Sequence, residues 1–205
     1  MMTTPQMQTE ARPTQDGDEP QDWGSIAVSF ARQMTLPNFS RGDLAGLRRM
    51  DPDEPGTTAA YWRLMAEKNL LRGSDVELKW ALILHGIALM TPRAGEEGEN
   101  RTAHEGFMPV GKALFLGGDA NRRERGYYSE SRLNRLLTAR GPMLRTLLAR
   151  MFRMVAASDQ PFNWREMARF ILNEDYDEDR FEMARRRIAS EYYQAERRSA
   201  QPESE

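Results

Sequence analysis

The sequence contains no cysteine and only two histidines and three lysines among its 205 residues. The lack of cysteine excludes disulfides and thiolate chemistry and fits a reducing compartment. His85 and His104 do not have the spacing of metal ligands. No apolar run is long enough to cross a bilayer, and no basic-then-apolar leader opens the sequence. We therefore expect a cytoplasmic protein with no metal, no cofactor and no membrane contact.

Catalytic motifs are also missing. The sequence has no phosphate-binding Gly-Lys-Ser/Thr loop, no His-Glu-x-x-His and no nucleophile elbow. Asp175, Asp177 and Asp179 match the first three ligands of a calcium loop, but arginine stands where the sixth-position glycine and the twelfth-position glutamate belong. This segment is predicted to be an acidic turn. We expect no enzyme and no small-molecule substrate, and an enzyme using His85 with nearby acids is the last-ranked hypothesis.

Arginine is the residue that the chain has in excess. It accounts for 26 of the 29 basic residues, although the formal net charge is only −2. Residues 120–150 hold eight arginines against two glutamates. Guanidinium groups bind phosphate bidentately and stack on bases better than ammonium groups do. An ordinary solvated helix face, or arginine codons favoured by a GC-rich genome, would produce a similar pattern.

The cationic segment 129–155 has the periodicity of two helices. Gly141-Pro142 divides it, because proline is tolerated in a first helical turn but not inside a helix. At about 100° per residue, Arg145, Arg150 and Arg153 share one side of the second helix and the apolar residues take the rest. The pattern predicts one face packed on a core and one cationic face in solvent.

The remaining sequence predicts an all-α helical bundle without a sheet. Amphipathic spacing predicts a helix from Trp23 to Met34, ended by Pro37, and a second one capped by Ser40. Ser74 and Glu77 form a capping box before the most apolar helix, in which His85 is expected to be a core residue. We predict four regions: a disordered acidic tail 1–22, a helical half 23–117 with a flexible loop at 91–106, an arginine-rich helical half 118–196, and a disordered tail 197–205.

The order of several segments resembles one known family. These segments are RGDLAGLRRMDPDEP, YWRL, WALILHGIALM, VGKALF, SESRLNRLLTARG, NWREMARFIL and RRRIASEYY. Together they resemble the CasB family, the small subunits of the type I-E CRISPR complex Cascade, over Trp23 to Tyr193. The acidic tail and the loop 91–106 are not part of this resemblance.

The resemblance implies an all-helical subunit without enzymatic activity in an antiviral ribonucleoprotein. It implies two copies in each complex, which contact the backbone and large subunits, help to hold the displaced DNA strand of the R-loop and line the path of the guide CRISPR RNA. By their position in the matching segments, the arginines assigned to nucleic acid are Arg48, Arg49, Arg72, Arg132, Arg135, Arg150, Arg185, Arg186 and Arg187. Charge and helical phase add Arg123, Arg140 and Arg145.

Two hypotheses for the arginines stay open at the level of sequence. The leading one is RNA and single-stranded DNA binding without sequence preference, because phosphate neutralisation requires no base-reading device. The alternative is a helical adaptor whose arginines bind acidic protein partners. The sequence does not separate arginines that contact RNA, DNA or a neighbouring protein, and it does not give the copy number.

Overall fold

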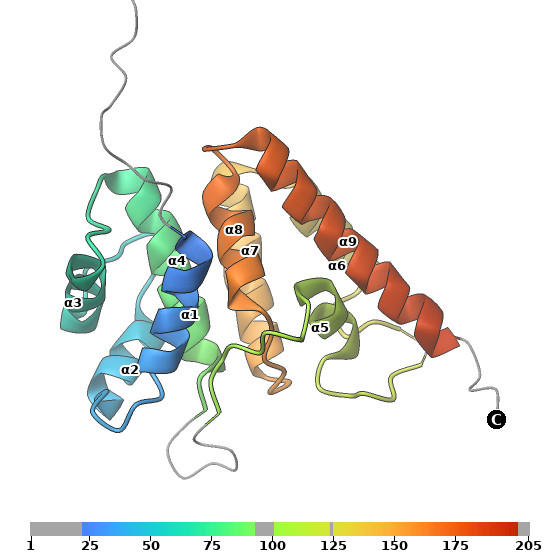
Figure 1. Ribbon diagram of the computed structural model, residues 1–205, viewed down its shortest axis with the longest axis horizontal. Helices are drawn as coiled ribbons and strands as arrows, with labels where there is room; N and C mark the ends of the chain where they lie inside the picture. The colour runs from blue at the N-terminus through green and yellow to red at the C-terminus, as the bar shows by residue number, and fades with distance from the viewer. Residues whose placement is uncertain (1–21, 93–100, 124, 201–205) are drawn as a thin grey trace, which may run out of the picture.

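The computed structural model describes residues 22–92, 101–123 and 125–200 (Figure 1). The predicted acidic tail, except Asp22, lies outside these residues, as do residues 93–100 of the predicted loop and residues 201–205 of the predicted C-terminal tail. The described part contains nine helices: α1 (Trp23–Gln33), α2 (Arg41–Arg49), α3 (Ala59–Glu67), α4 (Ser74–Met90), α5 (Val110–Leu116), α6 (Glu130–Thr138), α7 (Gly141–Ala156), α8 (Trp164–Asn173) and α9 (Glu178–Ala200).

The all-α prediction is confirmed. Within the described ranges, the only strand-like pairing is a single bridge between His104 and Phe162. None of the helices described is long and apolar enough to cross a membrane.

Four helices, α1, α4, α7 and α8, form the centre of the molecule. α1 packs on α8 and α4 packs on α7, while α4 also contacts α1 and α8. α2 and α3 lie on one side of this centre, and α5, α6 and α9 lie on the other (Figure 1). The most extensive contacts, α5 with α9, α1 with α8 and α4 with α7, each join a helix before residue 117 to one after it. The predicted division into two halves stays a prediction, and the packing interleaves them.

α4 is buried almost all round, as its apolar composition predicts. His85 is 1% exposed, and its Nδ1 lies 3.0 Å from the Leu47 carbonyl oxygen, so it is a hydrogen-bonded core residue. Burial lowers its pKa, because the imidazolium ion would lose its hydration there. The predicted capping box differs in one respect: Gly73 is the N-cap, and Glu77 accepts a hydrogen bond from the Gly73 N–H at 3.1 Å.

A buried ion pair links α4 to the residues that follow α8. Lys79 is 5% exposed, and its Nζ lies 2.7 Å from Asp175 and 3.7 Å from Glu174. Glu174 is also buried and accepts a hydrogen bond from the Gly141 N–H at the start of α7. Buried charges require partners of this kind, because an unpaired one would lose its hydration without compensation. The segment predicted to be an acidic turn therefore helps to join α4, α7 and α8.

Other boundaries differ from the predicted ones by a few residues. The spacing of Ala60, Tyr61 and Leu64 predicts a helix that is closed by Arg72-Gly73. The observed α3 ends earlier, at Glu67, and Asn69 has a φ of +53°. α9 continues to Ala200, four residues past the predicted end at 196. Its last turn carries Arg197 and Arg198, whose charge complements the C-terminal end of the helix dipole.

α5 is held by close backbone contact with α9. A Cβ atom placed on Gly111 would lie 2.1 Å from the Ile188 carbonyl oxygen and 2.7 Å from the Tyr192 nitrogen. Only glycine fits this approach. A helix of seven residues is not stable alone, so α5 depends on its contact with α9.

A pair of glutamates completes this junction. Glu166 on α8 is buried, accepts a hydrogen bond from the Val110 N–H at 2.9 Å and lies 2.6 Å from Arg187 Nε. Arg187 also contacts Glu191 at 2.8 Å. Burial raises the pKa of Glu166 above its usual 4.5, and the charge of Glu191 adds to the rise, while the Val110 hydrogen bond and Arg187 oppose it.

Replacement of Gly111 by alanine should destabilise the protein by about 1–3 kcal/mol, because the new methyl group meets backbone atoms that cannot rotate away. The urea midpoint measures this loss. Gly42→Ala is the matched control, since a Cβ there meets only Ser40 Oγ at 3.8 Å. It should leave stability unchanged or raise it by up to about 1 kcal/mol. Equal midpoints for Gly111→Ala and the wild type would disprove the close packing.

Glu166→Gln should alter the pH dependence of stability. A raised folded-state pKa favours the protonated form, so its contribution is present below 4.5 and is lost as pH rises through the folded value. Glutamine keeps an acceptor for Val110 without this loss. Relative to the wild type, the variant should therefore gain stability between pH 4 and pH 8, measured by urea denaturation.

Glu182→Gln is the control for this experiment, because its stability relative to the wild type should change with pH in the opposite direction. Hydrogen bonding to Arg185 lowers the pKa of the half-buried Glu182. This variant should lose stability relative to the wild type as pH rises through the unfolded-state value of 4.5. Parallel pH curves for Glu166→Gln and the wild type would contradict the assigned shift.

Candidate nucleic-acid interface

The predicted cationic segment folds as α6 and α7. α6 buries Leu133, Leu136 and Leu137 and exposes Arg132 and Arg135. Residues three apart lie on the same side of a helix, so the two guanidinium groups project from α6 together. They also lie near Tyr128: burial raises the pKa of that phenol, and the positive charges of both arginines oppose the rise.

α7 begins where the sequence predicts and continues this exposed side. Gly141 has a φ of +55°, which turns the chain, and Pro142 lies in the first turn. Arg150 and Arg153 are exposed, whereas the leucines of α7 are buried. The helix therefore separates apolar and charged residues as its periodicity indicates.

A contact between the two helices places their arginines on one side. Arg132 Nη1 donates to Met154 Sδ at 3.4 Å. Arg150 precedes Met154 by four residues, which puts it about 40° away around α7. We call Arg132, Arg135, Arg150 and Arg153 the α6–α7 arginine face. Within the part of the chain that the structure describes, no carboxylate contacts any of these four side chains.

Five other predicted arginines have carboxylate partners. Arg140 contacts Glu178 at 3.2 Å and lies over the Phe181 ring at 4.2 Å. Arg145 contacts Asp53 at 3.1 Å. Arg185 and Arg186 share Glu182, and Arg187 bridges Glu166 and Glu191. A phosphate at any of these guanidinium groups would compete with a carboxylate already there.

Two predicted arginines donate to backbone carbonyl groups. Arg48 is half-buried, and its guanidinium donates to the carbonyls of Ala88, at 2.7 Å, and Thr91. Arg48 thus satisfies acceptors at the C-terminal end of α4, where the helix dipole also favours a cation. The exposed Arg72 donates to the Asn69 carbonyl at 2.9 Å.

The last two predicted arginines, Arg49 and Arg123, are exposed and lie away from α6 and α7 in the sequence. Arg49 ends α2, and Arg123 lies on the segment between α5 and α6. The twelve predicted arginines therefore do not form one set. Three of them lie on the α6–α7 arginine face, and Arg153, whose helical phase puts it on the same side of α7 as Arg150, is the fourth member.

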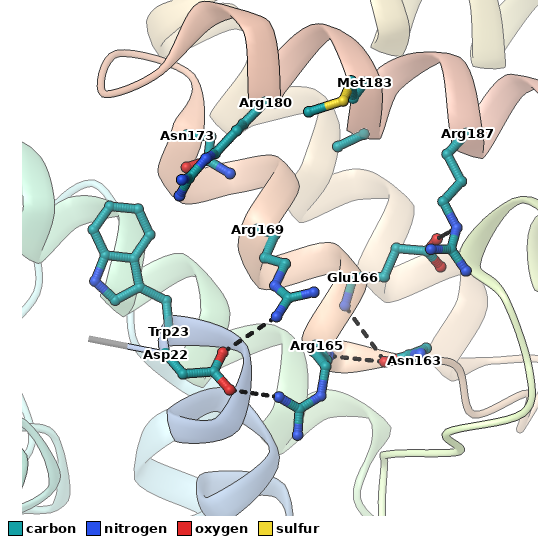
Figure 2. A pocket seen from close by; sticks show the side chains of 11 residues that line it. Asp22, Trp23, Asn163, Arg165, Glu166, Arg169, Asn173, Arg180, Met183 and Arg187 are labelled. Atoms are coloured by element: carbon teal, nitrogen blue, oxygen red, sulfur yellow. Dashed lines mark hydrogen bonds and ion pairs between the residues drawn. The ribbon is translucent and has the colours of Figure 1, made fainter. Parts of the chain in front are cut away.

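A cavity of about 700 Å³ lies elsewhere, between the start of α1 and helices α8 and α9. Figure 2 shows Asp22 at its edge between Arg165 and Arg169, which it contacts at 2.7 and 3.4 Å. A hydrogen bond from the Ser25 hydroxyl lowers the pKa of Asp22 to about 2. Burial opposes this shift, while the Ser25 backbone N–H and Arg165 add to it.

The other two cations of this cavity are also paired. Arg180 contacts Asp177 at 3.1 Å, and Arg187 contacts Glu166. Each arginine that lines this cavity therefore has a carboxylate partner, unlike those of the α6–α7 arginine face. Asp22 was assigned to the disordered tail, but its carboxylate caps α1 by accepting from the Ser25 N–H at 3.3 Å.

Groups suited to metal binding are not assembled in the part of the chain that the structure describes. Among the described residues, no three histidine, aspartate or glutamate side chains form a set that could hold a metal ion. His104 accepts a hydrogen bond from the Trp164 N–H through Nδ1 at 3.1 Å, which occupies one ring nitrogen structurally. The exposed arginines are thus the chemically distinctive feature of the surface.

A protein-family model described as CRISPR-associated protein Cse2 matches residues 43–193. No curated protein and no solved structure gives a significant match. The matched range begins in α2, ends in α9 and contains all twelve predicted arginines and Arg153. The chain therefore belongs to the Cse2 family, the CasB family to which its sequence motifs pointed, and is a small subunit of a CRISPR Cascade complex.

Proposed function

We propose that this Cascade small subunit binds nucleic acid without sequence preference, holds the displaced DNA strand of the R-loop and lines the path of the guide RNA. The observation that supports this most is the α6–α7 arginine face, where four exposed guanidinium groups have no carboxylate contact among the described residues. Members of the Cse2 family are structural and generally non-catalytic, which fits a role in binding.

The chemistry of this face suits the phosphate backbone. Arginine contacts to phosphates release counterions from the strand and give affinity that does not depend on the bases. In RNA-guided complexes the sequence is recognised by base pairing, and protein contacts to the backbone shift a nearly balanced strand exchange. A few arginines on a rigid helical surface are sufficient for that task.

The other predicted arginines are expected to contribute less to nucleic-acid binding. Arg49 and Arg123 could extend the contact, since both are exposed. Arg140, Arg145 and the Arg185 to Arg187 cluster would exchange a carboxylate for a phosphate, and the net gain from such an exchange is small. Arg48 and Arg72 already donate to carbonyl groups. We expect the backbone and large subunits and a second copy of this chain to complete the strand path.

The triple variant Arg132→Gln, Arg135→Gln and Arg150→Gln should weaken single-stranded DNA binding equally for all base compositions. Each lost phosphate contact lowers the slope of log K against log salt by about 0.7, so the slope should fall by about 2. Fluorescence anisotropy between about 50 and 200 mM salt measures this for the full-length chain and for the assembled complex. Circular dichroism should show unchanged helix content, because all three side chains are exposed.

Arg186→Gln is the matched control. Arg186 is equally exposed on a helix, but its charge is balanced by Glu182, which keeps Arg185 as a partner. This variant should leave the salt slope unchanged. The proposal fails if the control weakens binding as much as the triple variant, if the loss depends on base composition, or if the wild-type affinity does not respond to salt.

A competition experiment distinguishes the adaptor hypothesis from the nucleic-acid-binding role. If the arginine face binds only acidic protein surfaces, single-stranded DNA will not compete with the partner subunits for the isolated chain. Competition that disappears in the triple variant supports the nucleic-acid role. Its absence, together with failure of the triple variant to join the complex, would support the adaptor.

A further inference from the structure

A second cationic feature lies where α5, the segment after it and the C-terminal end of α9 meet. It is a cavity of about 330 Å³, at the small end of the range for ligand sites. Four of its ten lining residues are cations, and none is a carboxylate. The lining consists of Met108, Lys112, Leu116, Ala120, Asn121, Arg122, Arg123, Ala195, Arg198 and Ser199.

The cations come from three separate elements. Lys112 is half-buried on α5, one residue after the Gly111 contact that fixes this helix to α9. Arg198 is exposed on the last turn of α9, and Arg123 is exposed on the segment between α5 and α6. Within the residues described, none of the three contacts a carboxylate. The cavity therefore brings together positive charges that do not have counter-charges of their own.

Arg122 is held in place by two contacts. Its Nε donates to the Leu116 carbonyl at 2.8 Å, and its guanidinium carbon lies 5.5 Å from the centre of the Tyr127 ring. Neither contact uses the terminal amino groups or neutralises the charge. This geometry orients the fork of the guanidinium group before any ligand binds, which lowers the entropy cost of binding.

An ordinary structural role explains only part of this arrangement. The dipole of α9 favours a cation such as Arg198 at its end. It does not explain why Lys112, Arg122 and Arg123 surround the same space. Four like charges around one cavity repel one another, and an anion between them removes that repulsion.

We propose that this cavity binds a phosphate group. Asn121 and Ser199 add neutral hydrogen-bond donors to the four cations, a combination that suits phosphate oxygens. The lining has no aromatic side chain on which a base could stack, so the site recognises the phosphate and not a whole nucleotide. The source of the phosphate is either the backbone of a bound strand or the free ion.

The position of the cavity favours a strand. The Arg122 guanidinium group lies over the Tyr127 ring, and the Tyr127 hydroxyl donates to the Met154 carbonyl at 2.9 Å. Arg132 contacts the Met154 sulfur. Consecutive contacts thus lead from the cavity to the α6–α7 arginine face. A strand on that face could place a further phosphate in the cavity. This part rests on the proposed function and deepens it.

The test uses the full-length chain and the double variant Lys112→Gln, Arg198→Gln. Inorganic phosphate is titrated while backbone amide NMR signals are followed. Wild type should show saturable shifts at Lys112, Asn121 and Ser199, and the double variant should lose them. Arg197→Gln is the matched control, because Arg197 is an exposed neighbour on the same helical turn and does not line the cavity. It should keep the shifts.

A second arm measures single-stranded DNA. The double variant should lower the salt slope by about 1.4, while Arg197→Gln should leave it unchanged. If the double variant loses the phosphate shifts but keeps the salt slope of DNA binding, the ligand is the free ion, and the bound strand is overturned as the source of the phosphate.

Two further outcomes test the phosphate site itself and separate it from the proposed function. Absence of saturable shifts in the wild type, or their persistence in the double variant, would overturn the phosphate site. Normal phosphate shifts in a wild-type chain that does not bind DNA would support the site while refuting the proposed function, so the two failures are distinguishable. Circular dichroism of the double variant, whose replaced side chains are half-buried or exposed, checks that it folds.

Discussion

Pairing between arginine and carboxylate within the chain decides which parts of this surface can attract phosphate. The sequence has 31 acidic and 29 basic residues, so its charges nearly cancel. A cationic surface can exist only where folding keeps the acids away. Around the cavity between α1, α8 and α9, Asp22, Glu166 and Asp177 compensate the arginines. On α6 and α7, and in the small cavity beside α5, the described residues provide no such compensation. In the proposed function, local imbalance of charge, and not the net charge, is therefore what attracts a nucleic-acid strand to this small subunit.

The packing of α9 makes this imbalance possible. α9 crosses α5, α8 and α6 (Figure 1), and its Glu182 and Glu191 contact arginines of the same helix. Glu166, buried beneath Arg187, joins the same network at the start of α5. Since these acids are engaged there, they do not reach α6 and α7. The contact of Gly111 with the α9 backbone also fixes Lys112 beside the end of α9.

Helix positions follow from local signals in most of the chain. Ser40 accepts a hydrogen bond at the start of α2 as predicted. Asn163, which the sequence also predicts to be a cap because Glu166 follows three residues later, does so at the start of α8, and Gly117 ends α5 in the left-handed conformation. Local signals were misleading at the start of α4, where Gly73 is the cap, and at the ends of α3 and α9. The acidic segment at residues 174–179 had no visible purpose in the sequence. Its role depends on Lys79, almost a hundred residues earlier, which contacts Glu174 and Asp175.

The sequence by itself determined the helical class, the apolar and charged sides of each helix and the family, because periodicity, caps and motif order are local properties of the chain. It could not determine which arginines remain uncompensated. Arg145 and Arg150 look equivalent on one helix, yet Arg145 contacts Asp53 while Arg150 has no carboxylate contact among the described residues. Likewise, Lys112 and Arg198 carry no joint signal, since they are far apart in the sequence and meet only through the packing of α5 on α9. Only the tertiary structure decided these matters, because ion pairing acts over a few ångströms in space and ignores distance along the chain.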